Sequence, residues 1–161
     1  MNRVSGSGPR CRTAAVRGAA GYTLVEIVTV LVIAAILYSV ALPGYQHTVL
    51  KSGRAAARGI LLDVMTRQEQ YFINNKYYAV TLADLGLPEP YYINSQAEAV
   101  AEARATYQVN LEIQDEAYSG VAAVPHNRQS RDEACMTFSI SRTGIRAVSG
   151  VFSREPAHCW R

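Results

Sequence analysis

The segment Gly21-Tyr22-Thr23-Leu24-Val25-Glu26 is followed by an apolar run from Ile27 to Leu42, and this run is the first structural element that can be recognised in the chain. No Asp, Glu, Lys or Arg occurs between Ile27 and Leu50, and the run up to Leu42 is apolar on every face. A helix of this kind is buried in protein or in lipid. From Tyr22 to Leu42 such a helix would be about 30 Å long, which matches the hydrocarbon core of a bilayer.

A basic head precedes the apolar run. Residues 1–21 contain no acid but hold four arginines, namely Arg3, Arg10, Arg12 and Arg17. By the positive-inside rule, this head stays in the cytoplasm and the residues after 44 lie outside it. The whole chain has a formal net charge of +3, and removal of those four arginines leaves −1. The remaining chain therefore lacks the overall basic balance that is typical of nucleic-acid binding.

Two features of the apolar run require an explanation. The carboxylate of Glu26 costs about 2.5–3.5 kcal/mol if it is inserted to bilayer depth. It therefore either lies at the cytoplasmic interface or has a partner. Pro43 and Gly44 follow the run, and proline removes a helical hydrogen bond and kinks or interrupts a helix. We favour a kinked continuation at Pro43 and Gly44 over a plain helix end at the membrane surface.

The motif from Gly21 to Glu26, with Ala41-Leu-Pro-Gly-Tyr45 downstream, resembles the start of type IV pilins and pseudopilins. The resemblance implies that a prepilin peptidase cuts between Gly21 and Tyr22 on the cytoplasmic side, and that the new N-terminus at Tyr22 is methylated. Tyr22 departs from the phenylalanine that is usual there. The resemblance also implies that Glu26 meets the N-terminal amine of a neighbouring subunit, as a buried charge needs a partner.

After the apolar run, the pattern predicts an amphipathic helix over 45–74. Its apolar residues recur at three- and four-residue steps, for example Val49, Ala56, Ile60 and Val64. Residues 75–105 form a mixed connection, an αβ-loop, with a short helical turn near Thr81–Pro88. Within it, 97–105 is either another short helix or a loop. The tyrosine pairs at 77–78 and 91–92 are expected to pack against the helix rather than to stack on nucleic acid.

Residues 106–161 have the period of half-buried strands. Tyr107, Val109, Leu111 and Ile113 alternate with polar residues, and a hairpin is expected across Asp115-Glu116. Further strands are expected around Phe138 and from Ile145 to Val148, on either side of a turn at 142–144. The predicted fold class is therefore α+β, with a long N-terminal α-helical spine, half apolar and half amphipathic, packed on a C-terminal antiparallel β-sheet.

Three cysteines occur in the chain. Cys11 lies in the head, while Cys135 and Cys159 form an even pair in the exported part. An oxidising compartment favours a disulfide between them over two reduced thiols. Cys135 near a strand start and the terminal Cys159-Trp160-Arg161 also resemble minor pilins of the PilE type, in which a disulfide bounds the C-terminal D-region.

The sequence lacks patterns for catalysis or for tight cofactor binding. There is no nucleotide-binding loop, no Gly-x-Ser-x-Gly and no His-Glu-x-x-His. The three histidines are scattered, and the acidic pairs at 115–116 and 132–133 are interpreted as turn residues rather than as a calcium site. We therefore expect no enzyme activity, no catalytic residue, no metal and no cofactor.

Together these features predict a structural minor pilin of a type IV pilus, with a role in pilus assembly, adhesion or twitching motility. Its parts are a removed leader (1–21), an apolar transmembrane or filament-core helix (22–44), an amphipathic helix (45–74), the αβ-loop (75–105), and the sheet with its D-region (106–161). The expected partners are other pilin subunits, prepilin peptidase and the inner-membrane assembly platform. The expected location is the bacterial inner membrane, as a single-pass protein, and then the pilus at the cell surface.

Three other functions were weighed against this interpretation. The first is a pseudopilin of a type II secretion system, against which the terminal cysteine pair argues. The second is a competence pilin that captures DNA through the arginines of the D-region, which are Arg142, Arg146, Arg154 and Arg161. A solvated face explains these arginines more simply. The third is a membrane-anchored enzyme, which no catalytic constellation supports.

Overall fold

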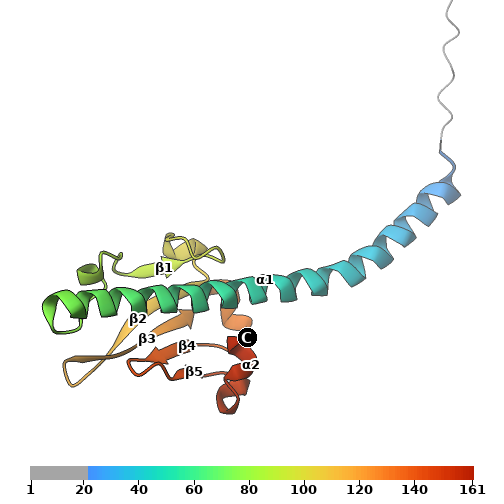
Figure 1. Ribbon diagram of the computed structural model, residues 1–161. Coiled ribbons are helices and arrows are strands. Elements are labelled where there is room, and N and C mark those ends of the chain that lie inside the picture. The colour runs from blue at the N-terminus through green and yellow to red at the C-terminus, as the bar shows by residue number, and fades with distance from the viewer. Residues whose placement is uncertain (1–21) are drawn as a thin grey trace, which may run out of the picture. The chain divides into compact units, whose positions relative to one another are not determined.

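The computed structural model describes residues 22–161, with the backbone alone for 40–44. The chain divides into two compact units, Met1–Val40 (unit 1) and Ala41–Arg161 (unit 2). One helix, α1 (Leu24–Asn75), contributes to both units (Figure 1). The predicted leader 1–21, including Gly21 of the expected cleavage site, lies outside the described residues.

In unit 1, Thr23 caps the start of α1. The backbone N–H of Glu26 donates to Thr23 Oγ1 at 3.2 Å. The Thr-x-x-Glu spacing is that of a capping box, and the positive end of the helix dipole favours the Glu26 carboxylate in the first turn. The Glu26 carboxylate itself makes no hydrogen bond among residues 22–161, so its local contribution is the favourable interaction with the helix dipole.

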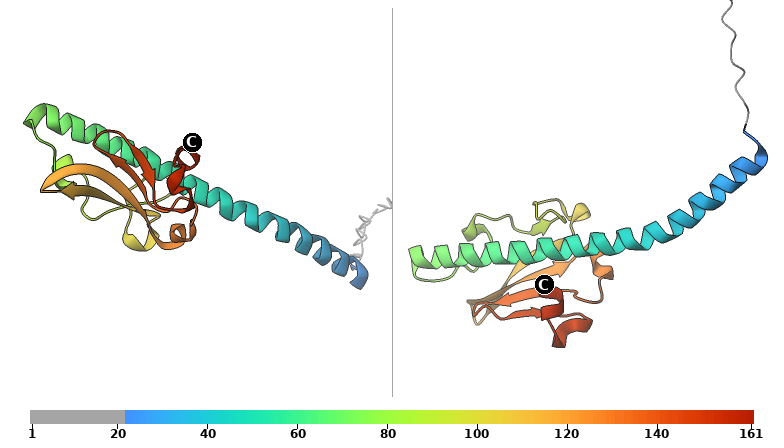
Figure 2. Two further views of the ribbon diagram at one scale, coloured as in Figure 1. Left: turned by 90° about the horizontal axis from the view of Figure 1, so that it is seen from below. Right: turned by 45° about the vertical axis from the view of Figure 1, so that its right-hand side comes forward.

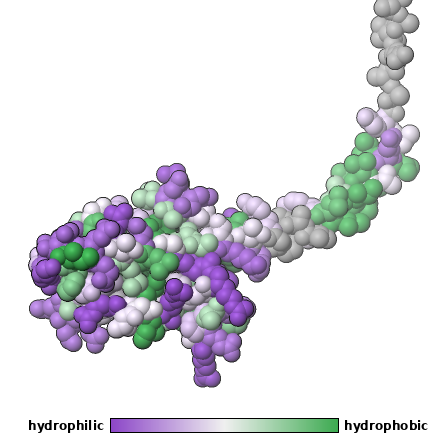
Figure 3. Space-filling model, viewed as in Figure 1, coloured by the Kyte–Doolittle hydropathy of each residue, from purple (hydrophilic) through white to green (hydrophobic). Residues whose placement is uncertain are grey.

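The rest of unit 1 presents apolar side chains to its surroundings. Leu24 is 81% exposed and Leu37 is 66% exposed. Figure 3 shows hydrophobic surface along this part of α1. Within residues 22–161, the structure contains no helix whose length and hydropathy suffice to cross a membrane.

The backbone of α1 is helical without interruption through Pro43 and Gly44. The predicted helical spine, expected to end near Asn74, is therefore present and ends at Asn75. The kink predicted at Pro43 and Gly44 stays a prediction.

Unit 2 combines the second part of α1 with a five-stranded antiparallel sheet of order β1-β2-β3-β4-β5. The strands are β1 (Tyr91–Ile93), β2 (Tyr107–Gln114), β3 (Ala117–Pro125), β4 (Phe138–Ser141) and β5 (Arg146–Val148). Short helices connect and end them, namely η1 (Ala83–Leu85), η2 (Glu102–Arg104), η3 (Asn127–Arg131), η4 (Val151–Arg154) and α2 (Ala157–Trp160). Figures 1 and 2 show α1 lying across one face of the sheet, with α2 beside it. The predicted α+β fold is confirmed.

The core lies between α1 and the sheet. Ala57, Leu61 and Val64 of α1 are fully buried, and they face the inward side chains of the strands, among them Tyr107 and Phe138. Small residues let the loops approach the helix closely. A Cβ added at Gly53 would lie 2.5 Å from Gln129 Oε1 and 2.9 Å from Thr106 Cγ2. The helix face expected from the three- and four-residue steps is therefore the buried face.

The connection after α1 is more ordered than expected. Gln68 is fully buried, and its amide donates to Ala79 O at 2.9 Å and accepts from Ala79 N at 3.0 Å. Tyr71 and Phe72 of α1 pack on Tyr77 and Tyr78, as expected for tyrosines that cover the helix. The connection also contains the edge strand β1, which the sequence analysis placed in a loop. Three residues are too few to show a strand period, so the strand is recognisable only from its pairing with β2.

The predicted disulfide between Cys135 and Cys159 is present, and its two cysteines are 24 positions apart in the sequence. It ties α2 to the segment before β4, and Cys159 is buried. The C-terminal residues are thereby fixed against the sheet and beside α1.

Candidate functional site

Unit 2 has a groove of about 450 Å³ lined mainly by basic side chains, which we name the basic groove. From α1 it receives His47, Lys51, Arg54 and Arg58, and from the C-terminal segment it receives His158, Cys159 and Arg161. The four α1 positions follow one another at steps of four, three and four residues, so they share one face of the helix. The groove forms because the disulfide brings the C-terminal segment to this face.

Several contacts hold α2 at the groove. Arg58 Nη1 donates to Cys159 O at 3.3 Å, and Trp160 Nε1 donates to Ala147 O at 3.2 Å. The Trp160 ring also packs edge-on against Phe138, with 5.5 Å between ring centroids. These contacts come from α1, β5 and β4, so the groove is positioned by the core of the unit.

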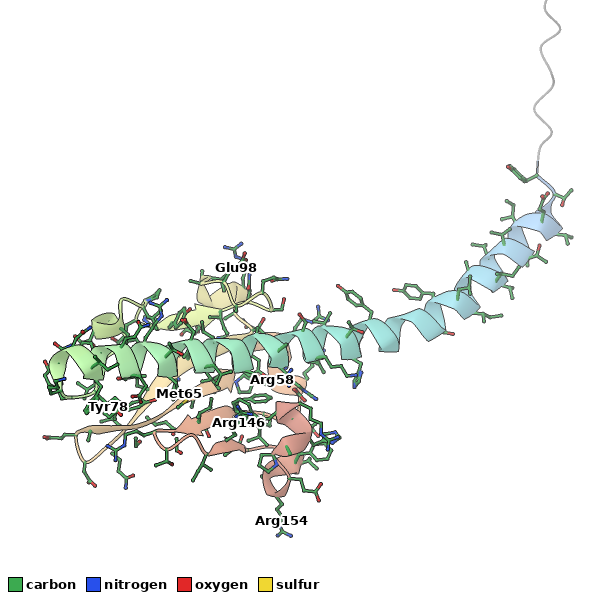
Figure 4. The ribbon with its side chains drawn as sticks, in the orientation of Figure 1. Arg58, Met65, Tyr78, Glu98, Arg146 and Arg154 are labelled. Atoms are coloured by element: carbon green, nitrogen blue, oxygen red, sulfur yellow. A yellow bond between two sulfur atoms is a disulfide. The ribbon has the colours of Figure 1, made fainter. Side chains whose placement is uncertain are left out.

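The four arginines of the predicted D-region do not form one cluster. The guanidinium of Arg142 lies over the Tyr78 ring at 5.9 Å, near the end of α1. Arg146 instead lies over the Trp160 ring at 5.3 Å, next to α2. Figure 4 shows Arg58, Arg146 and Arg154 at the end of unit 2 that carries α2. We refer to Arg146, Arg154 and Arg161 as the α2 arginines, because they lie around α2, on β5, on η4 and at the C-terminus respectively.

Most of this positive charge is not neutralised by a nearby acid. Among the Lys and Arg side chains of residues 22–161, only Arg54 and Arg67 form ion pairs. The α2 arginines are exposed and pair with no carboxylate in the described part of the chain. At the other end of the sheet, the β2–β3 turn carries Asp115 and Glu116 (Figure 1), while Glu133 and Glu155 lie at the end with α2 but form no ion pair in the described part of the chain. The end of the unit with α2 is therefore suited to a polyanion.

Arg54 has a structural role at the floor of the groove. Its guanidinium donates to both carboxylate oxygens of Asp132, at 2.7 and 2.6 Å, and the Asp132 side chain is only 1% exposed. Gln129 Nε2 donates to the same carboxylate at 3.2 Å. The hydrogen bonds to Asp132 raise the pKa of Arg54. This network fastens η3 to α1.

Burial also raises the pKa of two tyrosines in the core, Tyr107 and Tyr118. Burial raises the pKa of Tyr107, and the nearby carboxylate of Asp132 adds to the effect. Burial likewise raises the pKa of Tyr118 to about 12, and the hydroxyl group of Tyr118 has no hydrogen-bond partner within the described residues. Both side chains are neutral at physiological pH and belong to the packing of the sheet.

The predicted site residues lie in different parts of the structure. Tyr22 and Glu26 are exposed in unit 1, and the Glu26 carboxylate has no hydrogen-bond or ion-pair partner among residues 22–161. Cys135 and Cys159 hold the C-terminal segment that borders the basic groove. Within the same residues, no group of three or more His, Cys, Asp or Glu side chains is placed to hold a metal ion.

The contribution of α1 to the groove was not predicted from the sequence. The spacing of four basic or histidine residues could have placed them on one helix face, but the apolar face of the same helix gave the stronger pattern. These residues are His47, Lys51, Arg54 and Arg58. Their meeting with His158 and Arg161 depends on the disulfide and on the packing of Trp160, which no local pattern specifies.

Comparison with known families identifies the chain. A family described as "Type IV minor pilin ComP, DNA uptake sequence receptor" matches residues 43–139. The matched range includes most of α1 in unit 2, the strands β1 to β3 and the network of Arg54 with Asp132, and it ends before the α2 arginines. No curated protein matches the chain. Pilins are pilus and membrane proteins and not enzymes, which agrees with the resemblance at the N-terminus. Because the match covers more than half of its residues, the chain belongs to this family of type IV minor pilins.

Proposed function

We propose that this minor pilin binds duplex DNA and acts as a DNA receptor of a type IV pilus. The sequence pattern favours a structural pilin, with a competence pilin as an alternative, and the family match favours the competence pilin. The structural observation that supports the proposal is the unneutralised positive charge around α2. Basic side chains from α1, β5, η4 and the C-terminal segment meet there although they are far apart in the sequence.

The chemistry of these groups suits the DNA backbone. Guanidinium groups present several donors in a planar fork that fits phosphate oxygens. Arg146 is oriented by the Trp160 ring, and Lys51 and Arg161 border the basic groove without an ion-pair partner in residues 22–161. Such contacts supply affinity and position a duplex, while base-edge contacts would supply sequence preference.

We further propose that the chain is processed and assembled as the N-terminal motif implies. Cleavage between Gly21 and Tyr22 frees an amine at Tyr22, which is then methylated. In the fibre, Glu26 pairs with the corresponding amine of a neighbouring subunit. The exposed apolar side chains of unit 1 support burial against other subunits or lipid. Before assembly, the subunit is held at the inner membrane with its N-terminus in the cytoplasm.

The DNA proposal is tested with the full chain in a neutral detergent and a fluorescent duplex. Affinity is measured by anisotropy at several salt concentrations between 50 and 200 mM (about the range in which counterion release is resolved). Each phosphate contact contributes about −0.9 to the slope of log K against log salt. Replacing the three α2 arginines by glutamine should therefore weaken binding at low salt and flatten the slope by about 3.

A matched variant controls for net charge. Arg67→Gln, Lys76→Gln and Arg142→Gln remove the same charge near the end of α1, away from α2. This variant should keep at least most of the salt slope. Equal loss of slope in both variants would mean that the interaction depends on net charge and that α2 is not the contact surface. If the full chain shows no saturable affinity for duplex DNA at low salt, the receptor function is wrong.

A further inference from the structure

A second basic pocket lies on another side of α1, and we name it the stem pocket. Its volume is about 440 Å³, and its lining includes Val49 and Leu50 of α1 together with Arg104, Arg128 and Arg131. We propose that the stem pocket binds the phosphate headgroup of an anionic phospholipid and so holds unit 2 against the membrane before assembly. This inference rests on the membrane-held stage of the proposed function, and not on DNA binding.

The charge of the stem pocket points to an anionic ligand. Arg104, Arg128 and Arg131 are exposed, and none forms an ion pair or a side-chain hydrogen bond in the described part of the chain. The carboxylate of Glu102, the acidic residue of η2, lies 3.4 Å from His126 Nε2. Three unpaired guanidinium groups around one concave site can surround the oxygens of a phosphate group.

The side-chain amides of Asn127 and Gln129 join the elements that form the walls of the stem pocket. Asn127 Nδ2 donates to Glu102 O at 2.9 Å and to Ala105 O at 3.1 Å, which joins η3 to η2. Gln129 is only 3% exposed, and its Nε2 donates to Leu50 O at 3.3 Å, which joins η3 to α1. The three arginines therefore stand on connected elements, and little ordering is required when a ligand binds.

The position and the apolar wall favour a lipid. The apolar run of the same helix ends at Leu42, so Gln46 and Leu50 follow it by about 6 and 12 Å of helix. The headgroup layer on each side of a bilayer is about 5–8 Å thick, so Gln46 lies within it and Leu50 lies just beyond its outer edge. Gln46, Val49 and Leu50 line the stem pocket, and Ala105 adds a further apolar surface. A site with arginines and an apolar wall at the outer edge of the headgroup layer can take a phosphate group attached to an acyl-bearing glycerol.

The apolar wall favours this ligand over nucleic acid. The volume of about 440 Å³ suits a small molecule but is close to the 450 Å³ of the basic groove, so the apolar wall is what separates the two sites. A duplex is stiff and convex, so it would contact the rim but not the apolar wall formed by Val49 and Leu50. Different residues of α1 line the stem pocket and the basic groove. The lipid and the DNA would therefore contact different parts of the helix surface.

The test uses the full chain in neutral detergent, with lipid binding counted by native mass spectrometry. Three probes are compared, namely phosphatidylglycerol, phosphatidylcholine and glycerol phosphate. Phosphatidylglycerol should bind saturably with one molecule per chain, and the other two should bind at least about tenfold more weakly. The triple variant Arg104→Gln, Arg128→Gln, Arg131→Gln should lose about tenfold or more in affinity for phosphatidylglycerol. The matched variant with the three α2 arginines replaced by glutamine should retain it.

Several results would overturn the inference. Equal binding of phosphatidylcholine would show that charge selection is absent, and equal binding of glycerol phosphate would show that the pocket takes a free phosphate rather than a lipid. Equal loss in both arginine variants would show an effect of net charge. If the pocket variant loses duplex DNA affinity as strongly as the α2 variant, the pocket belongs to the DNA surface instead. Loss of lipid binding with intact DNA binding leaves the receptor function untouched, so the two failures are distinguishable.

Discussion

Removal of the disulfide should lower the free energy of unfolding of unit 2 by an amount set by the length of the loop that the disulfide closes. Cys135 and Cys159 are 24 positions apart, and the chain-entropy model gives about 3.4 kcal/mol for closing a loop of that size. Replacing both cysteines by alanine leaves no free thiol at these positions and loses little buried surface. With a urea slope of about 1.5 kcal/mol per molar, the unfolding midpoint should fall by about 2 M.

The assay has a built-in local probe. Trp160 is the sole tryptophan of the chain, and it lies next to Cys159 and against Phe138. Its fluorescence reports the C-terminal segment, while circular dichroism at the helix band reports α1. In the double alanine variant, we expect the fluorescence transition to occur at lower urea than the helix transition. The reason is that α2 has only four residues and is then held by Trp160 and by the Arg58 hydrogen bond.

Two outcomes would refute this reasoning. An unchanged midpoint would mean that the disulfide does not restrict the unfolded chain in the way that the loop model assumes. A lower midpoint with coincident transitions would mean that α2 and α1 unfold together without the disulfide. In that case the C-terminal border of the basic groove does not depend on the covalent link.

Three further predictions concern the buried polar groups. Asp132→Ala leaves the Arg54 guanidinium half-buried without its carboxylate, and should lower the free energy of unfolding by about 3 kcal/mol in urea titrations. A double-mutant cycle with Arg54→Ala should give a coupling of at least about 1 kcal/mol, and a coupling near zero would contradict the paired geometry. Gln68→Met leaves the N–H and C=O of Ala79 without their partner and should cost about 3 kcal/mol, whereas a change below about 0.5 kcal/mol would show that water replaces the amide. The pKa of Tyr118 is raised to about 12 by burial, so ionisation favours the unfolded chain and stability falls as the pH rises from about 10 to 12. Tyr118→Phe should be neutral or slightly stabilising at pH 7 and should reduce the alkaline loss by about 2 kcal/mol in thermal melts, and an equal alkaline loss would contradict this assignment.

The fold could be predicted from the sequence because its main elements have strong local patterns. The steps of three and four residues through Ala56, Ile60 and Val64 indicated the buried face of α1, and that face is buried. The alternation from Tyr107 to Ile113 indicated β2, and the acidic pair after it marked the turn to β3. Strand β1 was missed because three residues carry no period and are ordered by their pairing with β2.

The candidate site was predictable only in part. The arginines of the D-region were recognised in the sequence. Their division between two ends of the unit was not, because Arg142 contacts the Tyr78 ring and Arg146 contacts the Trp160 ring. The contribution of α1 was hidden by the stronger apolar pattern of the same helix. The stem pocket could not be predicted either, since Asn127 and Gln129 bring α1, η2 and η3 together through contacts with backbone carbonyls distant in sequence.

The most direct test of the receptor function is a selection for DNA sequence. The full chain in neutral detergent is incubated with sheared genomic DNA of the cell that produces it, and the retained fragments are sequenced together with the input pool. The proposed function predicts that one short nucleotide sequence (word) is enriched in the retained fragments relative to the input pool. It also predicts that a duplex with this word competes better than a shuffled duplex of equal composition. Retained DNA with the same word frequencies as the input, or no retained DNA, would contradict it.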